Sequence, residues 1–283
     1  MSETFPFTKM HGLGNDFIVV DLRAQPFADW FDDPGRIAAL CDRRHGIGAD
    51  GVLAIQEPRR HAREQGAVAR LRIRNADGSE AEMCGNGLRC VARYLQTSDR
   101  VGPQLKVETG AGILDCVLLD DGLIEIAMGK PSWEQLDAQL AIGGSPWPIT
   151  AVSMGNPHAV IFCDEASSPL ALQKLAEQHG AAIENAPNFP DRTNVEFVRR
   201  HPDGAFTVVV WERGCGITLA CGTGACAAVV AACVTERSQP GEWRLVHLPG
   251  GALSIRVEPD LGQVYLRGPA TTVFRGQYSR SDS

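Results

Sequence analysis

The four-residue sequence CGNG at residues 84–87 returns as CGTG at residues 221–224, and this repeat decides the expected fold. The two motifs lie 137 residues apart. A second pair of motifs, GNDFIVV at 14–20 and GNPHAVI at 155–161, is offset by 141 residues. Asn75 and Glu212 each stand nine residues before a motif cysteine. Three kinds of landmark at nearly equal offsets indicate an internal duplication, and therefore two pseudo-symmetric halves.

Each cysteine motif is followed by a segment that we expect to be a helix. After the first motif, apolar residues recur with the spacing of one helix face, at Leu88, Val91, Ala92 and Leu95. After the second, residues 225–234 are apolar on every side, as in a helix buried within a core. A cysteine at a helix start meets unpaired N–H groups and the positive end of the helix dipole. Both favour the thiolate and are expected to lower the pKa of the thiol.

The paired motifs also predict a chemistry. Their glycines let backbone N–H groups approach an anion such as a substrate carboxylate. If the duplication places the two helix starts on opposite sides of one cleft, Cys84 and Cys221 flank the carbon next to that carboxylate. Inverting a stereocentre without a cofactor needs a base on one face of the carbon and an acid on the other. We therefore predict that Cys84 and Cys221 form such an acid/base pair.

Simpler interpretations compete for several of these residues. A free cysteine is usually a small buried apolar residue, so we expect packing roles for Cys41, Cys90, Cys116, Cys163, Cys215, Cys226 and Cys233. The Gly-Asn pairs at 14–15 and 155–156 are also compatible with ordinary turns. His158 is compatible with a hydrogen-bonded structural histidine, and Glu212-Arg213 with an exposed ion pair.

Composition restricts the class of protein. The chain has 283 residues, 44% of them hydrophobic and 22% charged, which is enough to bury a substantial core and excludes a disordered or fibrous chain. The net charge of −7 argues against nucleic acid as a partner. The N-terminal residues lack the apolar core of a secretory signal, so we expect nine reduced cysteines in the cytoplasm. The ten-residue apolar run at 225–234 is too short to cross a membrane.

Local patterns predict many short strands and few helices, and therefore an α+β fold. We expect helices around 36–41 and 170–179, the second ending at Gly180. Hairpin turns are expected at residues 120–122 and 202–204. Polar, proline-rich sequence from 129 to 148 suggests a break in the strands and a domain boundary near its start.

The stretches around these landmarks resemble the diaminopimelate epimerase family over nearly the whole chain. The similar stretches are MHGLGNDF at 10–17, RHGIGADG at 44–51, NADGSE at 75–80, MCGNG at 83–87, MGNPH at 154–158, TNVEF at 193–197, ERG at 212–214 and ACGTGA at 220–225. The resemblance implies two domains, each a curved, mostly antiparallel sheet wrapped around a central helix. It places Cys84 in residues 1–128 with 266–283, and Cys221 in residues 129–265.

The same resemblance implies a reaction. This would be the epimerisation of LL-2,6-diaminopimelate to the meso form, in lysine and peptidoglycan-precursor biosynthesis, with neither a cofactor nor a metal. Cys84 and Cys221 would exchange the protons, assisted by His158 and Glu212. The reacting carboxylate would be held by the backbone of Gly85, Asn86, Gly222 and Thr223. The rest of this small-molecule substrate would be bound by Asn15, Asn75, Asn156, Asn194, Glu212 and Arg213.

Three positions bear on how far the resemblance extends. Some family members carry Gln where this chain has Gly51, and some carry Glu where it has Ile217. Certain relatives place Tyr at the position of Phe274 in a dimer contact, which makes a homodimer the expected assembly.

Three other classes of protein are alternatives to this family. Another two-cysteine racemase, of the proline racemase type, is the main alternative, although such enzymes typically carry CGHG rather than CGNG. A pyridoxal phosphate enzyme is disfavoured because no motif contains a lysine, the residue that would bind this cofactor. A redox or metal-binding protein is disfavoured because the chain has no C-x-x-C sequence.

Overall fold

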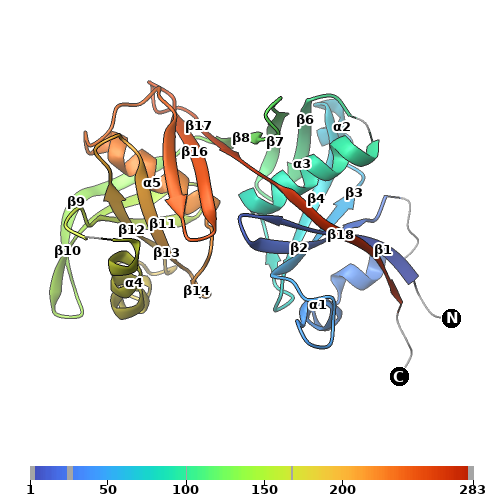
Figure 1. The fold of residues 1–283 in the computed structure, drawn as a ribbon, viewed down its shortest axis with the longest axis horizontal. Helices are drawn as coiled ribbons and strands as arrows, with labels where there is room; N and C mark the ends of the chain where they lie inside the picture. The colour runs from blue at the N-terminus through green and yellow to red at the C-terminus, as the bar shows by residue number, and fades with distance from the viewer. Residues whose placement is uncertain (1–3, 24–27, 100, 167, 280–283) are drawn as a thin grey trace. The chain divides into compact units, whose positions relative to one another are not determined.

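The computed structural model describes residues 4–23, 28–99, 101–166 and 168–279. The chain folds into two compact units (Figure 1), residues 1–126 with 268–283 and residues 127–267, called unit 1 and unit 2 below. The chain passes from unit 1 to unit 2 after residue 126 and returns after residue 267. Each of these positions lies two residues from the boundary expected from the sequence.

Unit 1 is built on strands that are interrupted by short helices. Its strands are β1 (Thr4–Gly12), β2 (Asn15–Asp21), β3 (Gly51–Gln56), β4 (Ala67–Asn75), β5 (Glu80–Ala81), β6 (Gln104–Thr109), β7 (Gly112–Leu118) and β18 (Thr271–Ser279), with β8 (Ile124–Gly129) at the crossing. Its helices are η1 (Ala28–Asp32), α1 (Pro34–Cys41), α2 (Arg60–Glu64) and α3 (Gly85–Asp99). Strand pairs β2–β3 and β4–β6 are parallel, whereas β1–β2, β3–β4, β4–β5, β6–β7 and β1–β18 are antiparallel.

Unit 2 repeats this plan. Its strands are β9 (Ser132–Ile142), β10 (Ser145–Ser153), β11 (Pro157–Phe162), β12 (Asn194–Arg200), β13 (Phe206–Glu212), β14 (Gly216–Ile217), β15 (Arg244–Leu248), β16 (Gly251–Val257) and β17 (Val264–Gly268), and its helices are α4 (Pro169–Glu184) and α5 (Gly222–Val234). Pairs β11–β12 and β13–β15 are parallel, and β10–β11, β12–β13, β13–β14 and β15–β16 are antiparallel. Strands β10 to β16 thus pair as β1 to β7 do, which confirms the α+β fold with two similar halves.

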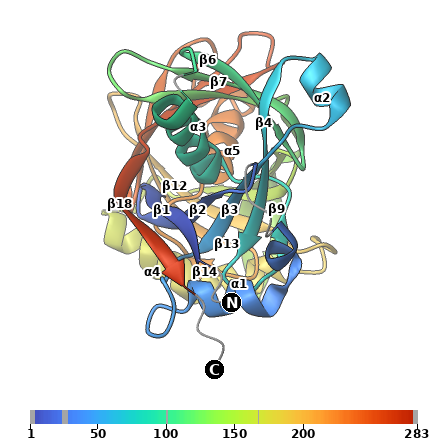
Figure 2. The same ribbon diagram turned by 90° about the vertical axis from the view of Figure 1, so that its right-hand side faces the viewer.

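A central helix organises each unit. In unit 1, α3 packs against β1, β2, β3, β4 and β7, and Figure 2 shows it among the strands of this unit. In unit 2, α5 packs against strands from β9 to β16. Apart from Thr223, its residues are Gly, Ala, Val and Cys, which put no large polar side chain on any face, so ten of its residues are buried. Each sheet therefore wraps around the helix that follows a cysteine motif.

Two local expectations were wrong. The helix expected to end at Gly180 continues to Glu184. A Cβ at residue 180 would lie 2.6 Å from ring carbons of Trp211, so glycine here allows α4 to pack closely against β13 rather than ending the helix. The region after residue 129 is not a break in the strands, because β9 and β10 form a long antiparallel hairpin.

The two predicted hairpin turns are confirmed. Gly122 joins β7 to β8 with φ of 84°, and Gly204 joins β12 to β13 with φ of 86°. Both lie in the left-handed region that glycine adopts without strain. No helix within the described part of the chain is both long and apolar enough to cross a membrane.

Candidate active site

The two motif cysteines occupy the same position relative to their helices. Cys84 directly precedes α3, and its Sγ accepts a hydrogen bond from Gly87 N at 3.4 Å. Cys221 is the N-terminal cap of α5, and its Sγ accepts from Gly224 N, also at 3.4 Å. In each unit the sulfur therefore satisfies one of the N–H groups that a helix start leaves unpaired.

Amides surround the Cys84 thiol, which is half-buried. It lies 3.8 Å from Asn15 Oδ1, which also accepts from Asn86 Nδ2 at 3.1 Å. Arg89, fully buried on α3, fixes the orientation of the Asn86 amide by donating to its Oδ1 at 2.7 Å. The structure thus brings together Cys84, Asn15 and Asn86.

An ionic network supports Asn15 from the other side. Asn15 Nδ2 donates to Asp50 Oδ2 at 2.8 Å, and Arg43 binds both Asp50 and Asp16. Lys9, although buried, forms an ion pair with Asp16 at 2.6 Å. Burial opposes ionisation of Asp16, but hydrogen bonds from Arg43 and Lys9 outweigh it and lower the pKa of Asp16 to about 2.

Asn75 ends β4 opposite Gly51, and its Nδ2 donates to Ser79 Oγ at 3.0 Å. A Cβ at residue 51 would lie 2.5 Å from the carbonyl oxygen of Arg74. This backbone therefore has no room for the Gln that some relatives carry at this position. Ile217, where some relatives carry Glu, packs against the apolar cluster beneath α4.

Carboxylates surround Cys221, in contrast to Cys84. Its thiol is buried, contacts Thr223 Oγ1 at 3.5 Å, and is hydrogen-bonded to Glu212. Burial, followed by the negative charges of Glu212 and Glu196, raises the pKa of Cys221 well above its ordinary value. The expectation that the helix start lowers this pKa was therefore wrong, because desolvation and the neighbouring carboxylates outweigh the helix start.

Glu212 is the carboxylate that is hydrogen-bonded to the Cys221 sulfur. It ends β13, where it accepts a hydrogen bond from Thr218 Oγ1. Burial raises its pKa, against the opposing effects of the Thr218 hydrogen bond and of His158. A carboxyl group with a raised pKa, bonded to a thiol, is suited to accept the proton that the thiol releases.

His158 lies in the same network on β11. Its Nε2 is 3.0 Å from Asn156 Oδ1, and its Nδ1 is 2.7 Å from Glu196 Oε1. Asn156 Nδ2 in turn contacts Thr223 Oγ1 at 3.4 Å. A continuous series of polar contacts therefore runs from Glu196 on β12 to the Cys221 sulfur.

Asn194 and Arg213 form a separate part of the unit 2 site. Asn194 Oδ1 accepts from Arg213 N at 2.9 Å, and Arg213 Nη1 donates to the carbonyl oxygen of Asp191 at 3.1 Å. Glu184, buried at the end of α4, accepts from Gly214 N at 2.8 Å and from Trp211 Nε1 at 2.8 Å. Glu184 therefore fixes the turn that carries Glu212 and Arg213.

Sequence reasoning missed the residues that support these side chains. Asp50, Arg89, Glu184 and Glu196 received no role, although Glu196 stands within the quoted TNVEF stretch. One feature of the sequence could have indicated a role for Glu196. It is a charged residue inside an apolar strand, between Val195 and Phe197. Cys215 was also expected to pack, but it is exposed on the turn after β13.

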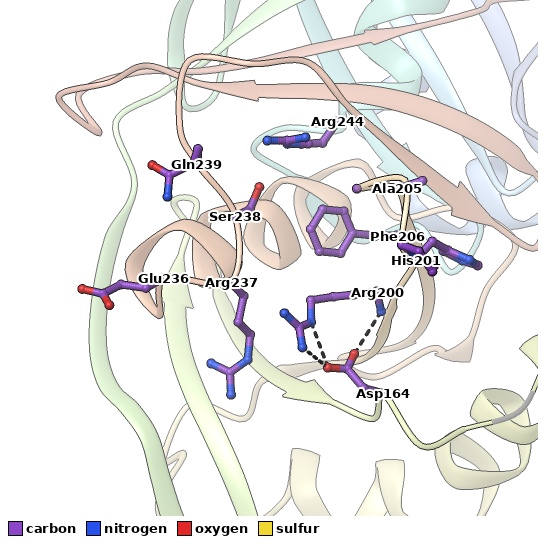
Figure 3. Close-up of a pocket in the computed structure, with 12 residues that line it drawn as sticks. Asp164, Arg200, His201, Ala205, Phe206, Glu236, Arg237, Ser238, Gln239 and Arg244 are labelled. Atoms are coloured by element: carbon purple, nitrogen blue, oxygen red, sulfur yellow. Dashed lines mark hydrogen bonds and ion pairs between the residues drawn. The ribbon is translucent and has the colours of Figure 1, made fainter.

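A cavity of about 540 Å³ in unit 2 lies away from these groups (Figure 3). It is lined by Glu236, Arg237 and Ser238, which follow the C-terminal end of α5, whereas Cys221 precedes its N-terminal end. At 1.5 Å per residue, α5 separates these ends by about 20 Å. The cavity's arginines already have carboxylate partners, such as Asp164 for Arg200 and Asp137 for Arg237. The cavity is therefore separate from the groups around Cys221.

Comparison with known proteins shows the family of this chain. The family model described as diaminopimelate epimerase matches residues 7–134 and 150–273. A diaminopimelate epimerase from Synechococcus sp. (strain JA-3-3Ab) is 44% identical over 293 aligned positions, which cover 98% of this chain and 99% of that protein. Another, from Carboxydothermus hydrogenoformans, is 45% identical and covers 96% of this chain and 98% of that protein. The chain belongs to the diaminopimelate epimerase family.

Solved structures with a similar fold are also found. A hydroxyproline epimerase from Agrobacterium vitis superposes with a TM-score of 0.73 at 18% identity, over 99% of this chain and 93% of that one. A PhzF-family phenazine biosynthesis protein from Bacillus anthracis gives 0.73 at 14% identity, over 98% and 99%. The chain has the diaminopimelate epimerase fold, and as a member of that family it is an isomerase.

Proposed function

We propose that the protein interconverts LL- and meso-2,6-diaminopimelate by exchanging one carbon-bound proton between two cysteines. One sulfur, as thiolate, takes the proton from the carbon next to a carboxylate, so that the C–H bond breaks and an S–H bond forms. The other sulfur, as thiol, gives its proton to the opposite face of that carbon. No oxidant, metal or cofactor is needed, because the carbon ends with the same number of electrons and protons. The equivalent placement of Cys84 and Cys221 before their helices carries this proposal.

The unit 2 contacts supply the proton handling for Cys221. Its pKa is raised, so the thiol form needs a partner that accepts its proton when it acts as a base. Glu212, hydrogen-bonded to the sulfur, is that partner, and His158 lies in the same network. The N–H groups at the start of each helix are suited to hold the substrate carboxylate and the charge that develops beside it.

The remaining polar residues fit a substrate with two charged ends. Amide groups of Asn15, Asn75, Asn156 and Asn194 can bind ammonium and carboxylate groups alike, and the Arg213 guanidinium suits the second carboxylate. A racemase of the proline type is the weaker alternative, since its substrate has no second charged end for Arg213 to bind.

Incubation with LL-diaminopimelate in deuterium oxide tests the proposal. We expect meso product with one deuterium at the inverted carbon, resolved by chiral chromatography and mass spectrometry. Proline and hydroxyproline serve as control substrates and should remain unchanged. Product without deuterium, or racemisation of proline at a higher rate, would contradict the proposal.

We also propose that the protein works as a homodimer in the reducing cytoplasm. Val273 and Phe274 on β18 are 55% and 47% exposed, and contact with a second copy would cover these apolar side chains. Reduced thiols at both motifs are required by the mechanism, which supports a reducing compartment. Sedimentation equilibrium of the wild type and of Phe274→Ser tests the assembly, and a monomeric wild type would exclude it.

A further inference from the structure

We propose that Glu196 is a positioning residue of this active site. Its carboxylate holds the His158 ring with a proton on Nδ1 and leaves Nε2, which contacts Asn156, as the nitrogen that exchanges protons. This inference rests on the proposed function, because it assumes that Cys221 and His158 act on the substrate.

The pairing of β11 with β12 places the two side chains together. The strands are parallel, with His158 opposite Asn194 and Val160 opposite Glu196. Both side chains are completely buried, and His158 Nδ1 lies 2.7 Å from Glu196 Oε1. A buried carboxylate with a partner at this distance is ordered by its surroundings, unlike an exposed ion pair.

The chemistry of the pair determines which ring nitrogen carries a fixed proton. An ionised carboxylate only accepts hydrogen bonds, so His158 Nδ1 must be the donor. The remaining nitrogen, Nε2, lies 3.0 Å from Asn156 Oδ1, which only accepts, so Nε2 is the donor of this hydrogen bond whenever it carries its exchangeable proton. The Nδ2 of the same amide contacts Thr223 Oγ1, which contacts Cys221 Sγ. Glu196 also balances the positive charge that the ring carries when both nitrogens are protonated. Without such a partner, a buried positive charge is strongly unfavourable.

The start of α5 accommodates the same carboxylate. A Cβ at residue 224 would lie 2.9 Å from Glu196 Oε1 and 3.3 Å from Cys221 Sγ, so Gly224 makes room for both groups. Glu196 Oε2 is buried and has no hydrogen-bond partner within the described part of the chain. The positive end of the α5 dipole is then a favourable neighbour for this charge.

Several titratable groups meet at this point. They are His158 from β11, Glu196 from β12, Glu212 from β13 and Cys221 before α5. Neutralising Glu196 removes one of the two carboxylates near the sulfur and leaves Glu212. The Cys221 thiol should then ionise at lower pH, while His158 Nδ1 faces a neutral amide in place of a carboxylate.

Glu196→Gln tests the proposal, because Gln keeps the shape and an acceptor oxygen but removes the charge. We expect kcat to fall by about 100-fold, at the lower limit of what general acid–base catalysis provides, with KM changed by less than about 3-fold. The matched control is Glu108→Gln, a buried carboxylate on β6 of unit 1 whose side chain is 4% exposed and which has no role in the site. That variant should keep the wild-type kcat.

Two measurements do not depend on turnover. Long-range proton–nitrogen NMR of the wild type should show His158 protonated on Nδ1, identified by the loss of its signals in His158→Gln. Iodoacetamide alkylation followed by peptide mass spectrometry should show Cys221 reacting at lower pH in Glu196→Gln than in the wild type. Glu196→Asp, which retains the charge, should restore the wild-type alkylation profile.

The outcomes separate this inference from the proposed function. If the wild type epimerises diaminopimelate but Glu196→Gln keeps its kcat and Cys221 profile, the inference is wrong and the function stands. A wild-type His158 protonated only on Nε2 would also overturn it, even if the variant fails to fold. If Cys221→Ala retains full turnover, the proposed function itself is wrong.

Discussion

The surroundings of Cys84 and Cys221 differ far more than the backbones that hold them. Each sulfur caps a central helix and accepts a 3.4 Å hydrogen bond from the N–H three residues later. Cys84 is half-buried among the amides of Asn15 and Asn86. Burial of Cys221, followed by the charges of Glu212 and Glu196, raises its pKa. The duplicated backbone thus fixes where each sulfur lies, while side chains from neighbouring strands determine how tightly it holds a proton.

The largest effect should come from removing either sulfur. Cys84→Ala and Cys221→Ala should each lower epimerisation by about 1,000-fold or more, because each removes one of the two proposed acid/base groups. Thermal unfolding should remain close to that of the wild type. Cys215→Ala, at an exposed cysteine, is the control and should keep full activity. Near-normal turnover in either motif variant would refute the idea that both halves take part.

A smaller effect should distinguish the equivalent positions Glu212 and Asn75. Glu212→Gln should lower kcat by about 100-fold, because it removes the carboxylate that we propose as the acceptor of the Cys221 proton. Since the pKa of Glu212 is raised, the wild-type kcat should fall on the acid side above the usual carboxyl range, and this limb should disappear in Glu212→Gln. Asn75→Ala should raise KM by about 10-fold and change kcat less. Equal losses of kcat in both variants would mean that the two halves handle protons alike.

The smallest effect concerns the ionic network next to Asn15 in unit 1, which consists of Lys9, Asp16, Arg43 and Asp50. Asp16→Asn should lower the free energy of unfolding by about 2 kcal/mol at pH 7, because it removes a carboxylate whose pKa is about 2 in the folded protein and about 3.9 in the unfolded chain. Because the folded pKa is the lower one, this stabilisation is complete well above pH 4 and declines as the pH falls toward 2. Urea unfolding at several pH values measures it.

The exposed Lys106–Asp115 pair provides the control for this ionic network. Its side chains are 46% and 61% exposed, so Asp115→Asn should change stability by less than about 0.5 kcal/mol. A pH-independent loss in Asp16→Asn would show that the effect comes from packing and not from charge.

Features with a local cause could be predicted from the sequence. The duplication, the helices after both cysteine motifs and the glycine turns at 122 and 204 each depend on residues close together in the chain. The end of α4 could not be predicted, because Gly180 is required by Trp211, which lies 31 residues away. The hairpin of β9 and β10 was concealed by prolines and polar residues, since much of β9 is exposed.

The site shows the same division between local and distant causes. The position of Cys84 and Cys221 before a helix could be predicted from their own flanking glycines. The high pKa of Cys221 could not, because it depends on desolvation and on carboxylates from β12 and β13. Glu196 could not be assigned a function either, since its partner His158 stands 38 residues earlier and meets it only through strand pairing.

The pairing of β1 with β18 has a consequence for the order in which the protein is made. Register partners run from Thr4 with Ser279 to His11 with Thr271, so the first strand of the chain completes its sheet with the last. The ribosome must therefore synthesise all of residues 127–267 before the partner of β1 exists. Unit 2 is continuous and can fold as it emerges, whereas unit 1 has to wait with one strand missing. Nascent-chain proteolysis should accordingly find the later half protected first.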